Sequence, residues 1–301
     1  MTNILLIGGN GYIGSNFYKN SAHKMSSVDI NLFGQNLNYS YAVNYDQINV
    51  DNFDVIILLA GHSSVPMCEF SPNRSWDNNV NYFHNLCKRI NKNQKLIYAS
   101  SASVYGITTD VSTEDSDINF NVLNHYDLQK ITIDLIANKY IAEGKNIIGL
   151  RFGTVNGLSP NTRSDLIINS MVKSAIQNGV VNVKNKHIRR AILGINDICK
   201  ALDVLVEIDI KSGQYNLSSF NSQVGQIANT VAEYTGAKLI EQANDKLAYD
   251  FMLSTEKFVN ATGFQFADTI ESLIKGLHDH MDSIQFDVRD NDRFFEKYYN
   301  K

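Results

Sequence analysis

Residues 3–17 read NILLIGGNGYIGSNF, and this stretch decides the fold of the first half of the chain. A short apolar run leads directly into Gly8, Gly11 and Gly14, which span the start of a helical pattern. Glycine at this spacing permits a tight turn, close approach of the backbone to a pyrophosphate, and close packing of helix on strand. Three glycines can also mark a plain turn, but their place after the first strand favours a dinucleotide site. The candidate cofactor contacts in the motif are Gly8, Gly11, Tyr12, Ile13 and Gly14.

Short apolar runs rich in β-branched residues alternate with helical patterns up to about residue 152. This alternation predicts an α/β fold built on a doubly wound parallel sheet. The predicted strands are 3–7, 26–30, 39–43, 53–59, 95–100 and 146–152, and the predicted helices are 12–20, 73–92 and 126–143.

The pattern becomes irregular beyond residue 153 and predicts a smaller, mixed α/β lobe that binds the substrate. Its expected helices are 164–178, 196–208, 223–236 and 268–281, and its expected strands are 180–184 and 213–218. We expect the sheet domain at 1–153 with a return segment near 190–214, and the lobe at 154–189 and 215–301. The cleft between two such units is the default ligand site. The tail 282–301 is expected to be a docked or frayed helix, with partner binding as the alternative.

Composition narrows the class of protein. The chain has 301 residues, is 44% hydrophobic and carries a net charge of −4. Its one tight basic cluster is 186–190, which makes nucleic acid an unexpected partner. The three widely spaced cysteines lack a metal-ligand pattern and suit reduced thiols in the cytoplasm. An apolar strand at Ile4 predicts no signal peptide, and no apolar run approaches the ~20 residues of a membrane span.

Asp29 closes the second predicted strand and favours NAD over NADP. A carboxylate at this place can hydrogen-bond the adenosine ribose and repel a 2′-phosphate. Neither Lys nor Arg occurs from Met25 to Asn73, so the following loop offers no cation for such a phosphate. Asp29 could also be an ordinary residue at the end of a strand.

Tyr126 and Lys130 lie four residues apart and so on one face of a predicted helix. A neighbouring ammonium is expected to lower the pKa of a phenol, which would let Tyr126 shuttle a proton near neutral pH. The chain has a second pair at this spacing, Tyr234 and Lys238, but a glycine interrupts that one. Ser101 follows the strand 95–100, and the carboxyl ends of parallel strands line the ligand cleft. The predicted catalytic residues are therefore Ser101, Tyr126 and Lys130.

Together these motifs resemble an extended short-chain dehydrogenase/reductase of the nucleotide-sugar epimerase/dehydratase family. The matching segments are GGNGYIG (8–14), LLAGHSSV (58–65), DNNVN (77–81), SSASVYG (100–106), YDLQK (126–130), LRFGTVNG (150–157) and the segment from Arg190 to Asp197. The stretch 59–81 is similar to bacterial UDP-galactose 4-epimerases. The resemblance implies a Rossmann-like sheet, NAD as cofactor, a nucleotide-diphosphate sugar as substrate, and a homodimer formed by helices 73–92 and 126–143.

The resemblance also implies roles for single residues. Tyr126 would accept a proton from a sugar hydroxyl as hydride passes to NAD, Lys130 would hold the nicotinamide ribose, and Ser101 would hydrogen-bond the reacting oxygen. The further cofactor-binding residues it implies are Asn44 near the adenine, Ala60, Gly61 and His62 along the dinucleotide, and Asn79 behind the site. The substrate-binding residues it implies are Ser101, Ser103, Thr154, Asn169 and Arg190, the last two facing the diphosphate.

The two residues after Ser101 make dehydration an unexpected reaction for this chain. The 4,6-dehydratases of this family carry Asp and Glu there, because loss of water needs an acid and a base; this chain has Ala102 and Ser103. The expected function is therefore a 4-epimerase working through a 4-keto intermediate. A one-way 4-dehydrogenase or 4-ketoreductase is the alternative, and a non-catalytic NAD sensor on the same fold is a further one.

Other features bear on the ligands. Thr154, Gly194 and Ser63 depart from common family residues, and no Arg occurs between Arg190 and Arg289 to supply a second diphosphate grip. The nucleotide and sugar therefore stay open. His278 and His280 point to different faces of a predicted helix, so no metal site is expected.

Overall fold

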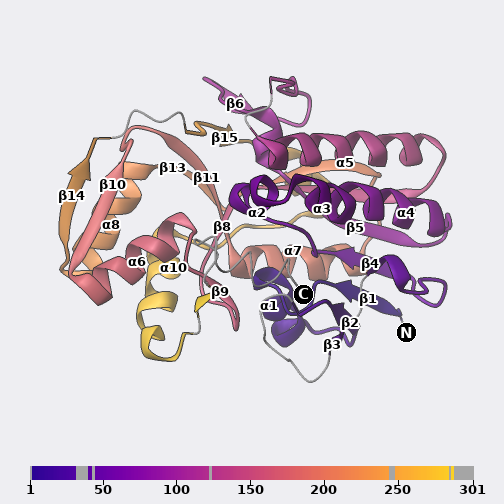
Figure 1. Cartoon of the computed structure of the whole chain (residues 1–301), viewed down its shortest axis with the longest axis horizontal. Helices are drawn as coiled ribbons and strands as arrows, with labels where there is room; N and C mark the ends of the chain where they lie inside the picture. Colours follow the sequence, from indigo (N-terminus) through magenta and orange to yellow (C-terminus); the bar gives the residue numbers. More distant parts are fainter. Residues whose placement is uncertain are drawn as a thin grey trace.

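A computed structural model describes residues 2–31, 40–42, 45–121, 124–243, 248–284 and 286–287 (Figure 1). Asn44 and most of the tail 282–301 lie outside these ranges, so the predictions made for them are not addressed. Within the described ranges, no helix has both the length and the apolar sequence that a bilayer span requires.

Seven parallel strands form the central sheet in the order β12-β7-β5-β4-β1-β2-β3, which confirms the predicted doubly wound fold. The strand order reverses between β1 and β4, and such a reversal opens a ligand crevice at the carboxyl ends of the strands. The strands are β1 (Ile4–Ile7), β2 (Ser26–Asp29), β3 (Ser40–Ala42), β4 (Val55–Leu58), β5 (Lys95–Ser101), β7 (Asn146–Phe152) and β12 (Gly213–Leu217).

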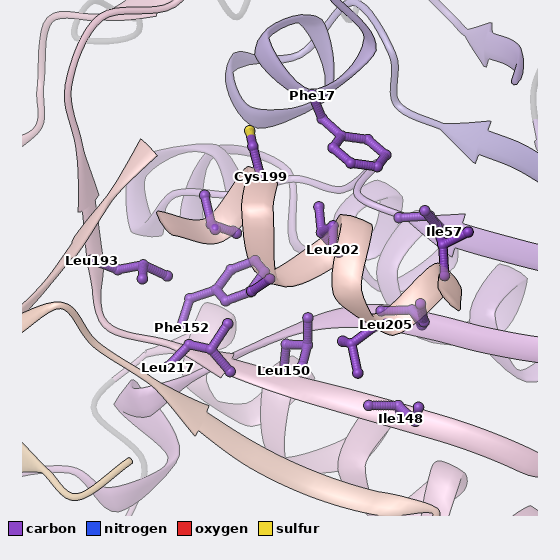
Figure 2. Packing of buried hydrophobic residues seen from close by; sticks show 14 of the residues in the cluster. Phe17, Ile57, Ile148, Leu150, Phe152, Leu193, Cys199, Leu202, Leu205 and Leu217 are labelled. Carbon is purple, nitrogen blue, oxygen red and sulfur yellow. The ribbon is translucent and has the colours of Figure 1, made fainter. Parts of the chain in front are cut away.

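Alternate side chains of the strands pack against helices on the two faces of the sheet. Leu6 joins the core under α1 (Tyr12–Asn20) and α7 (Ile195–Glu207). Figure 2 shows this layer, with Leu202 of α7 between Phe17 of α1 above it and Leu150 of β7 below it. Leu5 joins the opposite core, under α4 (Tyr82–Arg89) and α5 (His125–Ala142). Burial on both faces explains why these strands read as continuous apolar runs.

The helix predicted at 73–92 is interrupted. Two short helices, α2 (Val65–Phe70) and α3 (Pro72–Trp76), precede a π-helical turn at Asp77–Asn81, and α4 follows it. The wider turn buries Asn79 and directs its amide at the backbone of His62, which it contacts through both nitrogen and oxygen. Such turns occur often at functional sites, and an amphipathic pattern does not reveal them.

The smaller lobe is built from short sheets and three helices around a core of its own (Figure 1). Its helices are α6 (Ile167–Asn178), α8 (Val224–Thr235) and α10 (Ile270–His278). Its main strand groups are β13-β11-β8 (Phe220–Gln223, Arg189–Gly194, Thr154–Asn156) and β10-β14 (Val180–Lys184, Lys238–Gln242). The shorter pairs are β6-β15 (Val111–Ser112, Met252–Leu253) and β9-β16 (Thr162–Arg163, Phe286–Asp287).

The chain returns from the lobe to the sheet domain twice. The predicted boundary at residue 214 falls inside β12, because pairing with β7 continues to Leu217. Helix α9 (Glu256–Thr262) makes the second return and buries Phe258 in the core under α7. The segment 190–194 of the predicted return instead forms part of β11 in the lobe. The strand β12 lies at the edge of the sheet, and α9 shields that edge.

A buried ion pair ties α5 to the sheet, and we predict that its loss destabilises the protein. Arg151 of β7 donates to Asp134 of α5 at 2.9 Å, with about 5% of either side chain exposed. Asp134→Ala leaves the guanidinium buried and uncompensated, which should lower the free energy of unfolding by about 3–5 kcal/mol. Denaturant unfolding measures this loss. Glu143→Ala, which removes an exposed ion pair with Lys139 on the same helix, is the control; an equal loss there would contradict the prediction.

Candidate active site

One cavity of about 650 Å³ opens at the carboxyl ends of the central strands and extends to the lobe. Its walls come from the turn after β1, the loops after β4, β5 and β7, the start of α5, and three segments of the lobe. The predicted site residues that line it are Gly8, Gly11, Tyr12, Ile13, Gly14, Asp29, Ala60, Gly61, His62, Ser101, Ser103, Tyr126, Lys130, Thr154 and Arg190.

The glycine turn leaves no room for side chains. Gly8 has a φ of +97°, and a Cβ there would lie 2.5 Å from the backbone nitrogen of Ala60. A Cβ on Gly14 would lie 2.0 Å from the carbonyl oxygen of Gly8. Gly11 caps α1 without a side-chain hydrogen bond, so the first turn presents bare N–H groups to the cavity. Such a cradle fits the pyrophosphate of a dinucleotide.

Asp29 stands at the end of β2 and lines the cavity beside the glycine turn. One carboxylate oxygen accepts from the backbone nitrogen of Asn10 at 2.9 Å, and the other accepts from that of Asn31 at 2.8 Å. The carboxylate is thereby fixed in position. It lies where an adenosine ribose would meet the protein.

The loop after β4 forms the next part of the wall. Ala60, Gly61 and His62 line the cavity, while Asn79 lies behind them with its Oδ1 2.8 Å from the backbone nitrogen of His62. Burial lowers the pKa of His62 to about 4, so its imidazole is neutral at neutral pH. His62 therefore contributes a polar, uncharged side chain to this wall.

Ser101, Tyr126 and Lys130 converge in the cavity from β5 and the first two turns of α5. The side chain of Ser101 lies close enough to the hydroxyl of Tyr126 to lower the pKa of that phenol. The ammonium of Lys130 donates to the carbonyl oxygen of Ala99 at 2.7 Å and lies 5.6 Å from the centre of the Tyr126 ring. The three predicted catalytic side chains are thus grouped at one point.

The pKa of Tyr126 lies far above neutral pH in this structure, whereas the sequence led us to expect a phenol that titrates near it. Burial raises the pKa of Tyr126 to about 12, and the side chain of Ser101 opposes that rise. Burial also lowers the pKa of Lys130 to about 8. Ser101 is the group with the largest lowering effect on the pKa of the phenol.

The predicted substrate residues divide into two groups. Ser103, Thr154 and Arg190 line the cavity. The hydroxyl of Ser103 is buried, and no group in the described part of the chain hydrogen-bonds it. Asn169 does not line the cavity: its Oδ1 accepts from the backbone nitrogen of Gly157 at 2.9 Å, and its amide nitrogen donates to the carbonyl of Arg163 at the same distance. Asn169 therefore shapes the loop that carries Arg163.

The structure adds cavity residues that the sequence did not single out. Arg163 binds Asp165 through two hydrogen bonds, at 2.9 and 2.6 Å, and donates to the carbonyl of Ser63 at 3.2 Å. It supplies a second arginine to the cavity from a position before Arg190 in the chain, whereas the family resemblance implied one after Arg190. The sequence feature that could have indicated Arg163 is an Arg and an Asp two residues apart in the first loop of the lobe. Tyr249 and Phe251 also line the cavity, in a stretch without a motif.

The chain belongs to the NAD dependent epimerase/dehydratase family, whose model matches residues 4–218. It is 28% identical to Protein CapI of Staphylococcus aureus over 239 residues, which cover 68% of this chain and 69% of that protein. It is 25% identical to the UDP-glucose 4-epimerase of Mycoplasma genitalium, with coverage of 99% and 98%.

A solved structure of the same fold is the UDP-glucuronic acid 4-epimerase of Bacillus cereus in complex with UDP-glucuronic acid and NAD. It has a TM-score of 0.80 and 18% identity, and covers 94% of this chain and 100% of that chain. Solved sugar-nucleotide dehydratases also share the fold. The fold therefore does not separate epimerisation from dehydration. NAD is the cofactor of the family, and the glycine cradle and Asp29 fit it.

We predict that Gly14→Ala weakens NADH binding at least tenfold, because the new methyl group displaces the carbonyl of Gly8 from the cradle. Fluorescence titration with NADH measures the affinity. Gly276→Ala is the matched control, since Gly276 also lies in a helix but has open space around its Cβ position. Equal NADH affinity of the two variants would argue against the cradle.

We predict that Lys130→Met stabilises the protein while reducing its activity. The folded-state pKa of about 8 lies below the ordinary 10.5, so burying the ammonium destabilises the protein fully below pH 8, and stability rises between about pH 8 and 10.5. Denaturant unfolding at pH 7 should show a gain on the order of 1–3 kcal/mol that shrinks at pH 9.5. Lys139→Met, at an exposed site of the same helix, should show no such pH dependence. A loss of stability in Lys130→Met at pH 7 would refute the prediction.

Proposed function

We propose that the protein is an NAD-dependent nucleotide-sugar 4-epimerase that works through a 4-keto intermediate. The observation that carries the proposal is the grouping of Ser101, Tyr126 and Lys130 beside a dinucleotide cradle, with no carboxylate next to them among the described residues that line the cavity. The name of the Mycoplasma relative, which matches nearly the whole chain, supports the same reaction.

Each catalytic side chain has a task in this reaction. Bound NAD supplies the hydride acceptor and donor at C4 of the sugar. Tyr126 takes the proton from the C4 hydroxyl and later returns it, and Ser101 hydrogen-bonds the same oxygen while lowering the pKa of the phenol. Lys130 places its ammonium against the ring of Tyr126, where a ribose hydroxyl can also reach it. The proton would leave and return at the C4 oxygen, and the hydride would leave C4 and return to its opposite face, without loss of water.

The charges in the cavity favour this reaction over dehydration. Among the described residues that line it, the only carboxylates are Asp29 and Asp165. Asp29 is held at the glycine turn, and Asp165 is paired with Arg163. Neither is next to Ser101, where Ala102 and Ser103 stand instead. An acid and a base for the removal of water are therefore not at hand.

A nucleotide-diphosphate sugar suits the remaining part of the cavity. Arg163 and Arg190 both line it, and a guanidinium pairs well with diphosphate oxygens. A one-way 4-dehydrogenase or 4-ketoreductase could use the same groups, and labelled substrates separate it from an epimerase. The Tyr126 and Lys130 pair argues against a non-catalytic sensor. A cytoplasmic location and a homodimer remain predictions.

The test uses sugars labelled with deuterium at C4. Purified protein with NAD is incubated with UDP-glucose, UDP-glucuronic acid and the corresponding sugars of dTDP, GDP and ADP, and the products are followed by NMR. An epimerase should yield the C4 epimer with the deuterium retained, because the hydride leaves and returns within one active site. Stoichiometric NADH with an oxidised product would instead identify a dehydrogenase, and a product lighter by one water a dehydratase.

Tyr126→Phe separates catalysis from binding in the same assay. It should lower turnover by about 10²–10⁴, because the proton carrier is lost, and should leave NADH affinity within a few-fold. Tyr234→Phe, at a largely exposed tyrosine of α8, should retain full turnover. Full activity of Tyr126→Phe would overturn the assignment of the proton carrier.

A further inference from the structure

We propose that Asp127 and Tyr249 form a positioning pair, which ties the cavity wall at 249–251, against which Arg190 packs, to the helix that carries Tyr126. The pair would set the distance between the cation that binds the nucleotide diphosphate and the group that exchanges protons with the sugar. This inference rests on the proposed function, because it assigns Arg190 to the diphosphate.

The first half of the pair is a buried, fully hydrogen-bonded carboxylate. Asp127 is 2% exposed, and the hydroxyl of Tyr249 donates to its two oxygens at 2.9 and 2.8 Å. The side chain of Asn124 donates to the Tyr249 hydroxyl at 2.7 Å and to Asp127 at 3.0 Å. The same Asn124 caps α5 by accepting from the backbone nitrogen of Asp127. A buried network with every partner in place holds one geometry.

The second half of the pair supports Arg190. The guanidinium of Arg190 lies 5.8 Å from the centre of the Tyr249 ring and 6.0 Å from that of Phe251, and it donates to the carbonyl oxygen of Tyr249. Burial lowers the pKa of Arg190, and an arginine stays charged through such a shift. The ring, the carbonyl and the guanidinium therefore move together.

The stretch around Tyr249 is also held on its far side. Asp250 accepts from the side chain of Arg189 at 2.8 Å and from its backbone nitrogen at 3.0 Å. Phe251 donates through its backbone to the carbonyl of Arg189 at 3.3 Å. The lobe strand β11 thus fixes one side of the wall, and the contacts of the Tyr249 hydroxyl with Asp127 and Asn124 tie the wall to α5. Loss of those contacts would free the Tyr249 ring under Arg190 while β11 stays in place.

Asp127 also acts on Tyr126 through its charge. A carboxylate beside a phenol disfavours the phenolate, and Asp127 is among the groups that raise the pKa of Tyr126. The ionisable groups that face Tyr126 are Cys68 from α2, Arg163 from the lobe, Tyr249 from the wall, and Asp127 and Lys130 from its own helix. Of these, Arg163 lowers the pKa of the phenol, whereas Cys68 and Asp127 raise it.

Two variants separate the positioning role of the Tyr249 hydroxyl from the effect of the Asp127 charge on Tyr126. Tyr249→Phe keeps the ring under Arg190 and removes only the hydroxyl, so affinity for the nucleotide should fall about tenfold while NADH affinity is unchanged. Asp127→Asn keeps an oxygen that can accept from Tyr249 and removes the charge. Nucleotide affinity should then stay within a few-fold, and the limb over which the rate rises with pH, as Tyr126 loses its proton, should move to lower pH. Tyr234→Phe is the matched control and should change neither quantity.

Affinity is measured by calorimetry with UDP, dTDP, GDP and ADP, which requires no turnover. A failure of the proposed epimerase reaction therefore leaves the binding comparison intact, and unchanged NADH affinity shows that the variants are folded. The positioning role is overturned by unchanged nucleotide affinity in Tyr249→Phe, or by a wild-type chain that binds none of the four nucleotides. An unmoved pH limb in Asp127→Asn, if the wild type turns over, overturns the role of the charge.

Discussion

The close contact between two backbone segments at the glycine turn is the constraint on which the rest of the site depends. Because Gly8 approaches Ala60 too closely for any side chain, the ends of β1 and β4 meet just where the strand order reverses. Helix α1 then starts at a fixed angle, and the lobe is attached to it. Tyr12 donates to the carbonyl of Gly157 at 2.7 Å, and Asn161 donates to the carbonyl of Asn10 at 2.9 Å. The cofactor cradle and the substrate lobe therefore share one anchor.

Helix α5 carries a residue that lowers the stability of the fold and lies beside the reacting groups of the site. The face that it turns inward carries Lys130 and Asp134 as well as apolar residues such as Ile133. Asp134 is compensated by Arg151, whereas the ammonium of Lys130 has a carbonyl and an aromatic ring as its neighbours. Burial of this cation opposes folding, as its lowered pKa shows. Such a residue is explained by what it does to the reacting groups and not by packing.

The elements that could be predicted from the sequence are those whose information is local. Continuous apolar runs marked the buried strands, and the glycine spacing placed the first turn. The Tyr126 and Lys130 pair needed the period of a helix and a local context, since a glycine interrupts the second pair at that spacing. Features that depend on tertiary contacts could not be read in this way. The family resemblance implied that Asn169 faces the diphosphate, yet its side chain is buried on backbone groups. Tyr249 reaches Asp127 across 122 residues of sequence, and no pattern along the chain encodes that pairing.

The hydroxyl groups around Tyr126 fit a reaction whose substrate and product differ only in configuration at one carbon. An epimerase must bind sugars of both configurations at C4, so the groups that hydrogen-bond the sugar there must suit more than one orientation. A serine hydroxyl can donate or accept and rotates to suit. Ser100 and Ser103 are buried at the cavity with no hydrogen-bond partner among the described residues, and Ser101 lies between them. Their unsatisfied hydroxyls leave hydrogen bonds that a sugar in either configuration can complete, since a buried polar group without a partner is destabilising until it finds one.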